Sequence, residues 1–158
     1  MWGTLFSLTN VIALIGWALL VAAPRKPLVH SVILYLCVAL LCLIYTALFA
    51  LVLGGAVDPQ QVPRAVAGAG AGAGAIDFTT IPGVRGFFAS DGGVVIGWTH
   101  YLAFDLFTGL WIARDGDNKG FSRITQAPFL LITLLVGPVG LLAWLIMRER
   151  RARATGRG

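Results

Sequence analysis

The sequence predicts an all-α integral membrane protein: a four-helix bundle with a long connector between helices 2 and 3 that carries a short interfacial helix. Hydrophobic residues make up 58% of the 158 positions and charged residues only 12%, which is typical of membrane proteins rather than soluble domains. Four apolar stretches are long enough to cross a bilayer. Much of the formal net charge of +5 lies in a basic tail, residues 148–158, which suits anionic lipid. Basic patches with interleaved aromatic residues are absent, so no nucleic-acid partner is expected.

The first two predicted spans cover residues 5–23 and 28–53. Pro24 and Pro27 separate them, because proline lacks an amide donor and clashes with the preceding helical turn. The start of the sequence has no basic region of the kind found in signal peptides, so we expect the first span to be retained. It also lacks an arginine-rich and serine-rich presequence, and the expected location is therefore a bacterial inner membrane.

The connector has two parts with different composition. Residues 67–75 alternate alanine and glycine, which predicts a flexible tether. The following part predicts a short amphipathic element at the membrane interface, broken at Pro82 and Gly83. Such an element is either a lid over a lateral pocket or a plain interfacial anchor. Its apolar residues recur at spacings near three, at Ile76, Phe78, Ile81, Val84, Phe87 and Phe88.

The last two predicted spans are residues 94–113 and 128–147. Gly137 and Pro138 lie near the middle of the fourth span, where proline removes one hydrogen bond and predicts a kink. Residues 1–158 then form a single membrane domain with both termini on one side. The tail arginines slightly outweigh the cations on the opposite face, which favours a cytoplasmic location for both termini.

The third span holds the residues most indicative of function, His100 and Asp105. Ionisable groups at such depth are costly unless they face protein or water. Each also has a structural alternative: a hydrogen-bonded buried imidazole for His100, and an interhelical hydrogen bond or ion pair for Asp105. At 1.5 Å per residue, Asn10, Tyr45 and His100 lie about 8 to 12 Å deep from the connector side, so they can form one layer with Tyr101.

Helical geometry separates the two ionisable groups by about 140° around the helix. Asp105 shares its face with Trp98 and Tyr101, whereas the His100 face carries the aromatic residues Phe104, Phe107 and Trp111. No cysteine or carboxylate is spaced to join His100 at a metal. His30 enters from the opposite side, about 18 Å away, so a haem iron cannot bridge the two histidines. We therefore expect no metal and no cofactor.

The block W-T-H-Y-L-A-F-D-L-F-T-G-L-W from Trp98 resembles the abscisic-acid-deficient-four-like family, as do P-F-L-L-I-T-L-L-V-G-P-V-G-L-L from Pro128 and I-D-F-T-T-I-P-G-V from Ile76. Plant members of this family are plastid membrane proteins required to make neoxanthin from violaxanthin, and related sequences occur in bacteria. The sequence departs from the plant pattern in lacking a plastid transit peptide and in its glycine-alanine tether. The resemblance therefore implies a bacterial relative whose substrate need not be violaxanthin.

The plant activity implies a cofactor-free isomerisation of an epoxy-carotenoid to an allenic alcohol, in which an acid protonates the epoxide oxygen and a base removes a proton from the adjacent carbon. On this hypothesis His100 and Asp105 transfer protons, and Tyr101 acts beside them with Asn10 in positioning oxygen. The expected partners are a carotenoid or other long apolar ligand, membrane lipid and, because the chain is small, a second copy in a homodimer. The candidate substrate-binding residues are Asn10, Tyr45, Trp98, Phe104, Phe107 and Trp111.

Two other function classes stay open. One is a non-enzymatic carotenoid-binding or complex-assembly subunit, with Trp17 and Trp144 added to the aromatic groove. The other is a small transporter or proton path, which the intramembrane ionisable pair favours. The sequence lacks the duplicated interrupted helices that many transporter folds show.

Overall fold

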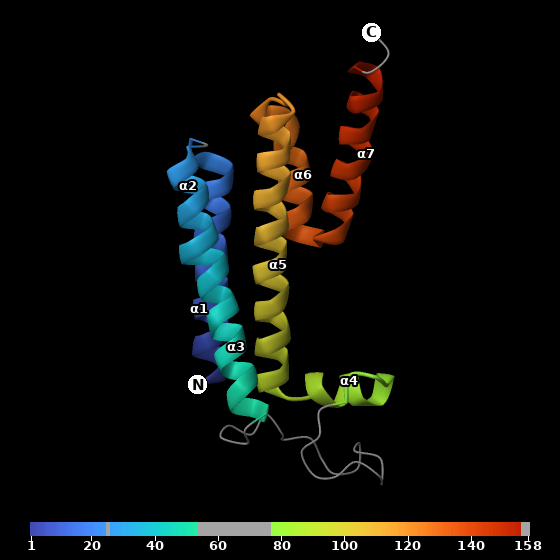
Figure 1. Ribbon diagram of the computed structural model, residues 1–158. Helices are drawn as coiled ribbons and strands as arrows, with labels where there is room; N and C mark the ends of the chain where they lie inside the picture. The colour runs from blue at the N-terminus through green and yellow to red at the C-terminus, as the bar shows by residue number, and fades with distance from the viewer. Residues whose placement is uncertain (25, 54–76, 156–158) are drawn as a thin grey trace. The chain divides into compact units, whose positions relative to one another are not determined.

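A computed structural model describes residues 1–24, 26–53 and 77–155, and all regular secondary structure in these ranges is helical (Figure 1). The predicted all-α class is confirmed, and the tether predicted at 67–75 lies outside the described residues. Two helical stretches are long and apolar enough to cross a membrane: helix α1, Trp2–Ala22, and the run Pro27–Val52. A membrane location is consistent with these two helices, whereas the bundle of four spans stays a prediction.

The second helical run is continuous but not uniform. It consists of α2, Pro27–Val32, a π-helical stretch η1, Ile33–Val38, and α3, Ala39–Leu53. Pro27 occupies the first turn, where an amide donor is not needed, and so begins the helix one residue before the predicted span. The π-helical stretch, which the sequence did not predict, buries Ile33, Cys37 and Val38.

The short helix expected in the connector is α4, Ile81–Phe88, but the predicted break at Pro82 and Gly83 is wrong. Pro82 lies in the first turn, where its missing amide costs nothing and its fixed φ favours the helix. Thr80 is the N-cap, and its side chain accepts a hydrogen bond from the Gly83 amide at 3.2 Å. These residues therefore begin the helix instead of ending it.

Helix α5, Asp91–Asn118, contains the predicted third span and extends beyond it at both ends. At its start the hydroxyl of Ser90 accepts from the Gly93 amide at 3.0 Å, a capping bond that begins the helix before the apolar run. At 1.5 Å per residue, the 28 residues of α5 measure about 42 Å, more than the ~30 Å of a hydrocarbon core.

The chain forms two helices, not one kinked helix, over the residues of the predicted fourth span, 128–147. Helix α6, Arg123–Val136, ends at Gly137, whose φ of 17° and ψ of −85° are not helical. Helix α7, Pro138–Thr155, begins at the next residue. Pro138 cannot donate to the α6 ladder, and Gly137 adopts the irregular conformation needed for a full reversal instead of a kink. Figure 1 shows α6 and α7 as antiparallel neighbours.

The chain divides into two compact units, each formed by segments that are distant in sequence. Unit 1 comprises Met1–Val11 and Leu40–Leu102, with a buried core formed by Leu48, Val52, Val95 and Ile96. Unit 2 comprises Ile12–Ala39 and Ala103–Gly158. Its buried residues include Trp17, Leu20, Ile33, Leu106, Leu110, Leu130 and Trp144.

The contacts of Arg148 show where α7 returns within unit 2. Within unit 2, Arg148 Nε lies 3.1 Å from Asp115 Oδ2, near the C-terminal end of α5. Trp144 Nε1 donates to the same oxygen at 3.0 Å, and Lys119 pairs with Oδ1 at 2.6 Å. The start of the tail therefore returns to the end of unit 2 where α5 stops and α6 begins.

Candidate functional site

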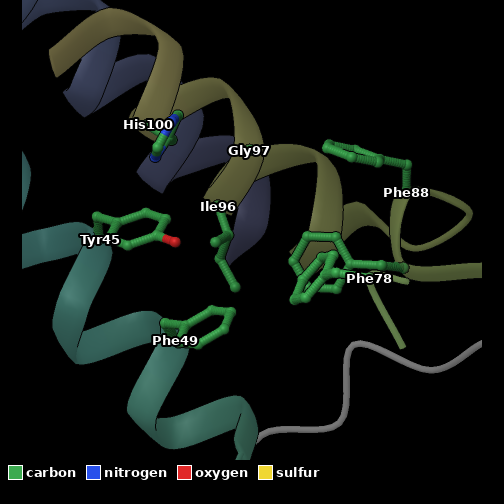
Figure 2. Close-up of a pocket in the computed structure, with 8 residues that line it drawn as sticks. Tyr45, Phe49, Phe78, Phe88, Ile96, Gly97 and His100 are labelled. Carbon is green, nitrogen blue, oxygen red and sulfur yellow. The ribbon is translucent and has the colours of Figure 1, made fainter. Parts of the chain in front are cut away.

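Unit 1 contains a pocket of about 180 Å³ between α3, the segment around α4 and the first turns of α5. Figure 2 shows the hydroxyl of Tyr45 directed into this space, with His100 on the neighbouring helix. Tyr45 and His100 carry the polar side-chain groups of the lining, and the other lining residues are apolar. The lining consists of Tyr45, Phe49, Phe78, Phe87, Phe88, Ile96, Gly97 and His100.

A continuous series of ring contacts surrounds the pocket. The Tyr45 ring lies 5.5 Å from the His100 ring and 5.7 Å from the stacked ring of Phe49, measured between centroids. Phe49 in turn lies 6.4 Å from Phe78, and Phe78 lies edge-on to Phe87 at 5.2 Å. All four separations are in the range of favourable aromatic contacts. The rings thus connect α3, α4 and α5 within unit 1.

Asp77 anchors the segment that carries Phe78 into the pocket wall. Its carboxylate accepts from Thr79 Oγ1 at 2.7 Å, from Thr80 Oγ1 at 2.6 Å and from the Thr79 amide at 2.8 Å. These hydrogen bonds, with the Thr79 side chain first, lower the pKa of Asp77 to about 2 because they favour the charged form. Gly83 packs so closely on Asp77 that a Cβ there would overlap the Asp77 backbone.

Gly97 forms the floor of the pocket under Phe88. A Cβ at position 97 would overlap the outer edge of the Phe88 ring, so the ring can lie on α5 only because this residue is glycine. Phe87 and Ser90 hold the corner between α4 and α5, since Ser90 Oγ donates to the Phe87 carbonyl at 3.2 Å. The segment for which the sequence left a lid and an interfacial anchor open thus contributes residues to the pocket wall, and its position at the membrane interface stays a prediction.

The predicted polar layer exists in unit 1 as two separate groups. Tyr45 and His100 form the first. In the second, Trp98 Nε1 donates to Asn10 Oδ1 at 3.1 Å, and the Trp98 ring stacks on Tyr101 with centroids 5.2 Å apart. Asn10 and Trp98 are not part of the pocket lining, nor is Tyr101. The Asn10–Trp98 hydrogen bond joins α1 to α5, whereas the Trp98–Tyr101 stacking lies within α5.

The structure does not bring Asp105 into this pocket. Asp105 belongs to unit 2, is 9% exposed, and its carboxylate lies against Gly137, where a Cβ would overlap it. This position is beside the first turn of α7, and a helix N-terminus stabilises negative charge. The structural alternative for Asp105, an interhelical hydrogen bond or ion pair, stays a prediction. His100, by contrast, is exposed at the surface of unit 1, where its ring contacts Tyr45, and its structural alternative stays a prediction.

The remaining predicted ligand residues on α5 also lie in unit 2. Phe104 and Phe107 are 58% and 48% exposed, and neither lines the pocket. Trp111 has a structural contact, since the Arg148 guanidinium lies 5.4 Å from the centre of its ring in a cation–π arrangement. Trp17 and Trp144 are buried in unit 2 and are core residues.

Sequence reasoning missed Phe49 and the anchoring role of Asp77. Phe49 lies one helical turn after Tyr45, so the four-residue spacing of the two aromatic residues was the available signal. The spacing of Asp77 to Thr79 and Thr80 is typical of an Asx turn before a helix. Among the described residues, no three histidine, cysteine or carboxylate side chains are grouped so that they could hold a metal ion.

Residues 4–144, nearly the whole chain, match the sequence profile of the ABA DEFICIENT 4-like family. The chain belongs to the ABA DEFICIENT 4-like family. This membership confirms the resemblance carried by the block from Trp98 and indicates a membrane role related to carotenoids and neoxanthin. No curated protein and no solved structure matches the chain significantly.

The matched region includes every pocket residue and, apart from Trp2 and Gly3, both helices long enough to cross a membrane. The tail beyond residue 144 lies outside the match. The pocket is thus located in the part of the chain that defines the family.

Proposed function

We propose that the protein binds the oxygenated ring end of a carotenoid in the pocket of unit 1 and isomerises an epoxide on that ring to an allenic alcohol. The observation that carries the proposal is the composition of the pocket, an aromatic wall with only Tyr45 and His100 as polar side chains. A cyclic hydrocarbon with one oxygen substituent matches such a lining. The family supplies the carotenoid class.

The size of the pocket limits what it encloses. Sites that enclose a whole small molecule usually measure about 300 to 1,000 Å³, whereas this one measures about 180 Å³. It therefore suits one ring of a long ligand, and the polyene would extend into lipid or along protein. We also propose that a second copy of the chain covers part of this polyene, which chemical cross-linking in the membrane tests.

The reaction needs a proton to move from carbon to oxygen and nothing else. The imidazole of His100 removes a proton from the polyene carbon next to the epoxide, and the C–H electrons form the new double bond of the allene. The epoxide C–O bond breaks with its electrons on oxygen, where the Tyr45 hydroxyl stabilises the developing charge by a hydrogen bond. The imidazolium then returns the proton to that oxygen, so atoms and electrons balance without a cofactor.

Asp105 is not needed in this scheme. It lies about 140° around α5 from His100 and packs on Gly137. Tyr45 takes the place in the mechanism that the sequence assigned to Asp105 and Tyr101. The carboxylate then has a structural role in unit 2.

Co-expression with a violaxanthin-producing pathway in bacteria, followed by pigment analysis, tests the proposal. We expect neoxanthin from the wild-type chain and none from His100→Ala, with reduced yield from Tyr45→Phe. The matched controls are His30→Ala and Tyr35→Phe, which change the same residue types outside the pocket and should retain product. Neoxanthin that persists in His100→Ala at wild-type protein levels would exclude this mechanism.

A second candidate, a carotenoid-binding or assembly subunit without turnover, is favoured by the scarcity of polar groups in the pocket. Violaxanthin that co-purifies in mild detergent and is recovered unchanged supports this candidate. Fractionation of the same cells tests the further proposal that the protein resides in a bacterial inner membrane.

A further inference from the structure

Within unit 1, helix α4 lies across the first turns of α5 instead of continuing its axis (Figure 1). Phe87 in α4 packs on the buried cluster that contains Val52 and Val95. Val52 is the last residue of the apolar run Pro27–Val52, which is long enough to cross a membrane. Helix α4 is therefore located beside the end of an apolar run, at the level where that run would leave a bilayer.

One side of α4 is turned toward the apolar stretch of α5. The ring of Phe88 lies on Gly97, three positions after that stretch begins at Val94. Ile81 precedes Phe88 by seven positions, so the two side chains lie only about 20° apart around the helix. Ile81 thus belongs to the same side of α4 as Phe88.

This side of α4 is apolar, and the rest of unit 1 leaves much of it uncovered. Ile81 is 76% exposed, and the rings of Phe88 and of Phe78, just before the helix, are about half exposed. None of the residues Ile81–Phe88 is fully buried, so α4 is not a core helix. Large apolar side chains that gather on one side of an element indicate an interaction surface, whereas single exposed ones do not.

The opposite side of α4 has no apolar bulk. Gly86 lies about 140° around the helix from Ile81, and a Cβ built on it meets open space. Arg85 is exposed at the edge of the apolar side, where its stem can lie along lipid while its guanidinium reaches water. Short helices with one apolar side and a cation at its edge are typical of the membrane interface.

We propose that α4 lies in the membrane interface, with Ile81, Phe78 and Phe88 inserted among the lipid acyl chains and Gly86 facing headgroups and water. The occupant of the apolar surface is the bilayer and not a protein partner, because the neighbouring helices of unit 1 are also apolar and exposed there. Leu51 near the end of α3 and Val94 near the start of α5 are examples.

This placement also specifies how the ligand of unit 1 arrives, a step that rests on the proposed function. A carotenoid with an oxygenated end ring is amphipathic, so its polar end lies at the interface and its polyene among the acyl chains. Phe78, Phe87 and Phe88 belong to the interfacial segment and also line the pocket. The ring therefore reaches the pocket from the lipid, at the depth that it already occupies.

Spin labels on the two sides of α4 test its position without a ligand. Single cysteines are introduced as Ile81→Cys and Gly86→Cys in a Cys37→Ala, Cys42→Ala background, labelled with a nitroxide and reconstituted into phosphatidylcholine vesicles. Power saturation compares collisions with oxygen, which concentrates among acyl chains, and with a nickel chelate, which stays in water. We expect the ratio of oxygen to nickel collisions to be higher at Ile81→Cys than at Gly86→Cys.

Three results would overturn the interfacial position. Equal preference for nickel at both labels would place α4 in water, and equal preference for oxygen would place the whole helix among the acyl chains. Protection of the Ile81→Cys label from both reagents would show that protein covers this surface. Both sites are exposed, so the labelled variants should keep the helical content of the wild type. Failure of violaxanthin to bind in the same vesicles would refute the proposed function and leave the measured position of α4 unchanged.

Discussion

Replacement of Gly97 by alanine tests whether Phe88 forms a wall of the ligand pocket. The new Cβ would lie 2.8 Å from the Phe88 Cζ atom, whereas carbon atoms pack best at about 3.5 to 4.0 Å. Phe88 Cε1 would be closer still, so the ring must move by more than about 1 Å or rotate outward, which its 47% exposure allows. Alanine also favours the helix by up to about 1 kcal/mol, so the unfolding temperature should change little.

Ligand affinity should respond differently. One aromatic contact contributes about 0.5 to 1.5 kcal/mol, so loss of the Phe88 contact should weaken binding roughly two- to twelvefold. Titration of the detergent-solubilised protein with violaxanthin, followed by the pigment absorption shift, measures this change. Gly86→Ala in α4 is the matched control, because a Cβ there meets open space. Unchanged affinity in Gly97→Ala would show that Phe88 does not contact the ligand.

Two further predictions concern the supports of the two units. The pKa of Asp77 is lowered to about 2 in the folded chain, below its ordinary value of 3.8, so its contribution to the 77–80 turn is present above pH ~4 and is lost as pH falls towards 2. The protection factor of the Thr79 amide, its exchange rate relative to the intrinsic rate at each pH, should fall across that window, and Asp77→Asn should remove this fall; an unaltered protection profile in the variant would contradict the assignment. Gly137→Ala should destabilise the protein by about 1 to 3 kcal/mol, because the Cβ overlaps the buried Asp105 carboxylate. Thermal unfolding measures this loss, Gly3→Ala is the open-space control, and equal unfolding temperatures would refute the contact.

Part of the candidate site could be predicted from the sequence. Depth along the helices predicted one layer that contains Tyr45 and His100, whose ring centroids lie 5.5 Å apart, because rise per residue is nearly constant in any α-helix. Depth along a helix could not predict which of these side chains face a ligand pocket. Asp105 and His100 share one helix, yet their surroundings depend on packing partners such as Gly137 that are distant in sequence.

The sequence by itself determined the helical class, the family and the two helices apolar enough to cross a membrane, since composition and local periodicity suffice for these properties. Only the tertiary structure decided whether a glycine-proline pair bends a helix or reverses it. At Gly137 the chain reverses because Phe129 and Trp144, as well as Arg148 and Asp115, gain contacts that a single kinked helix would separate. At Pro82 the same residue type begins a helix, because Thr80 and Asp77 stabilise the turn before it. Local sequence restricts the conformations available to each residue, and contacts between distant segments select one of them.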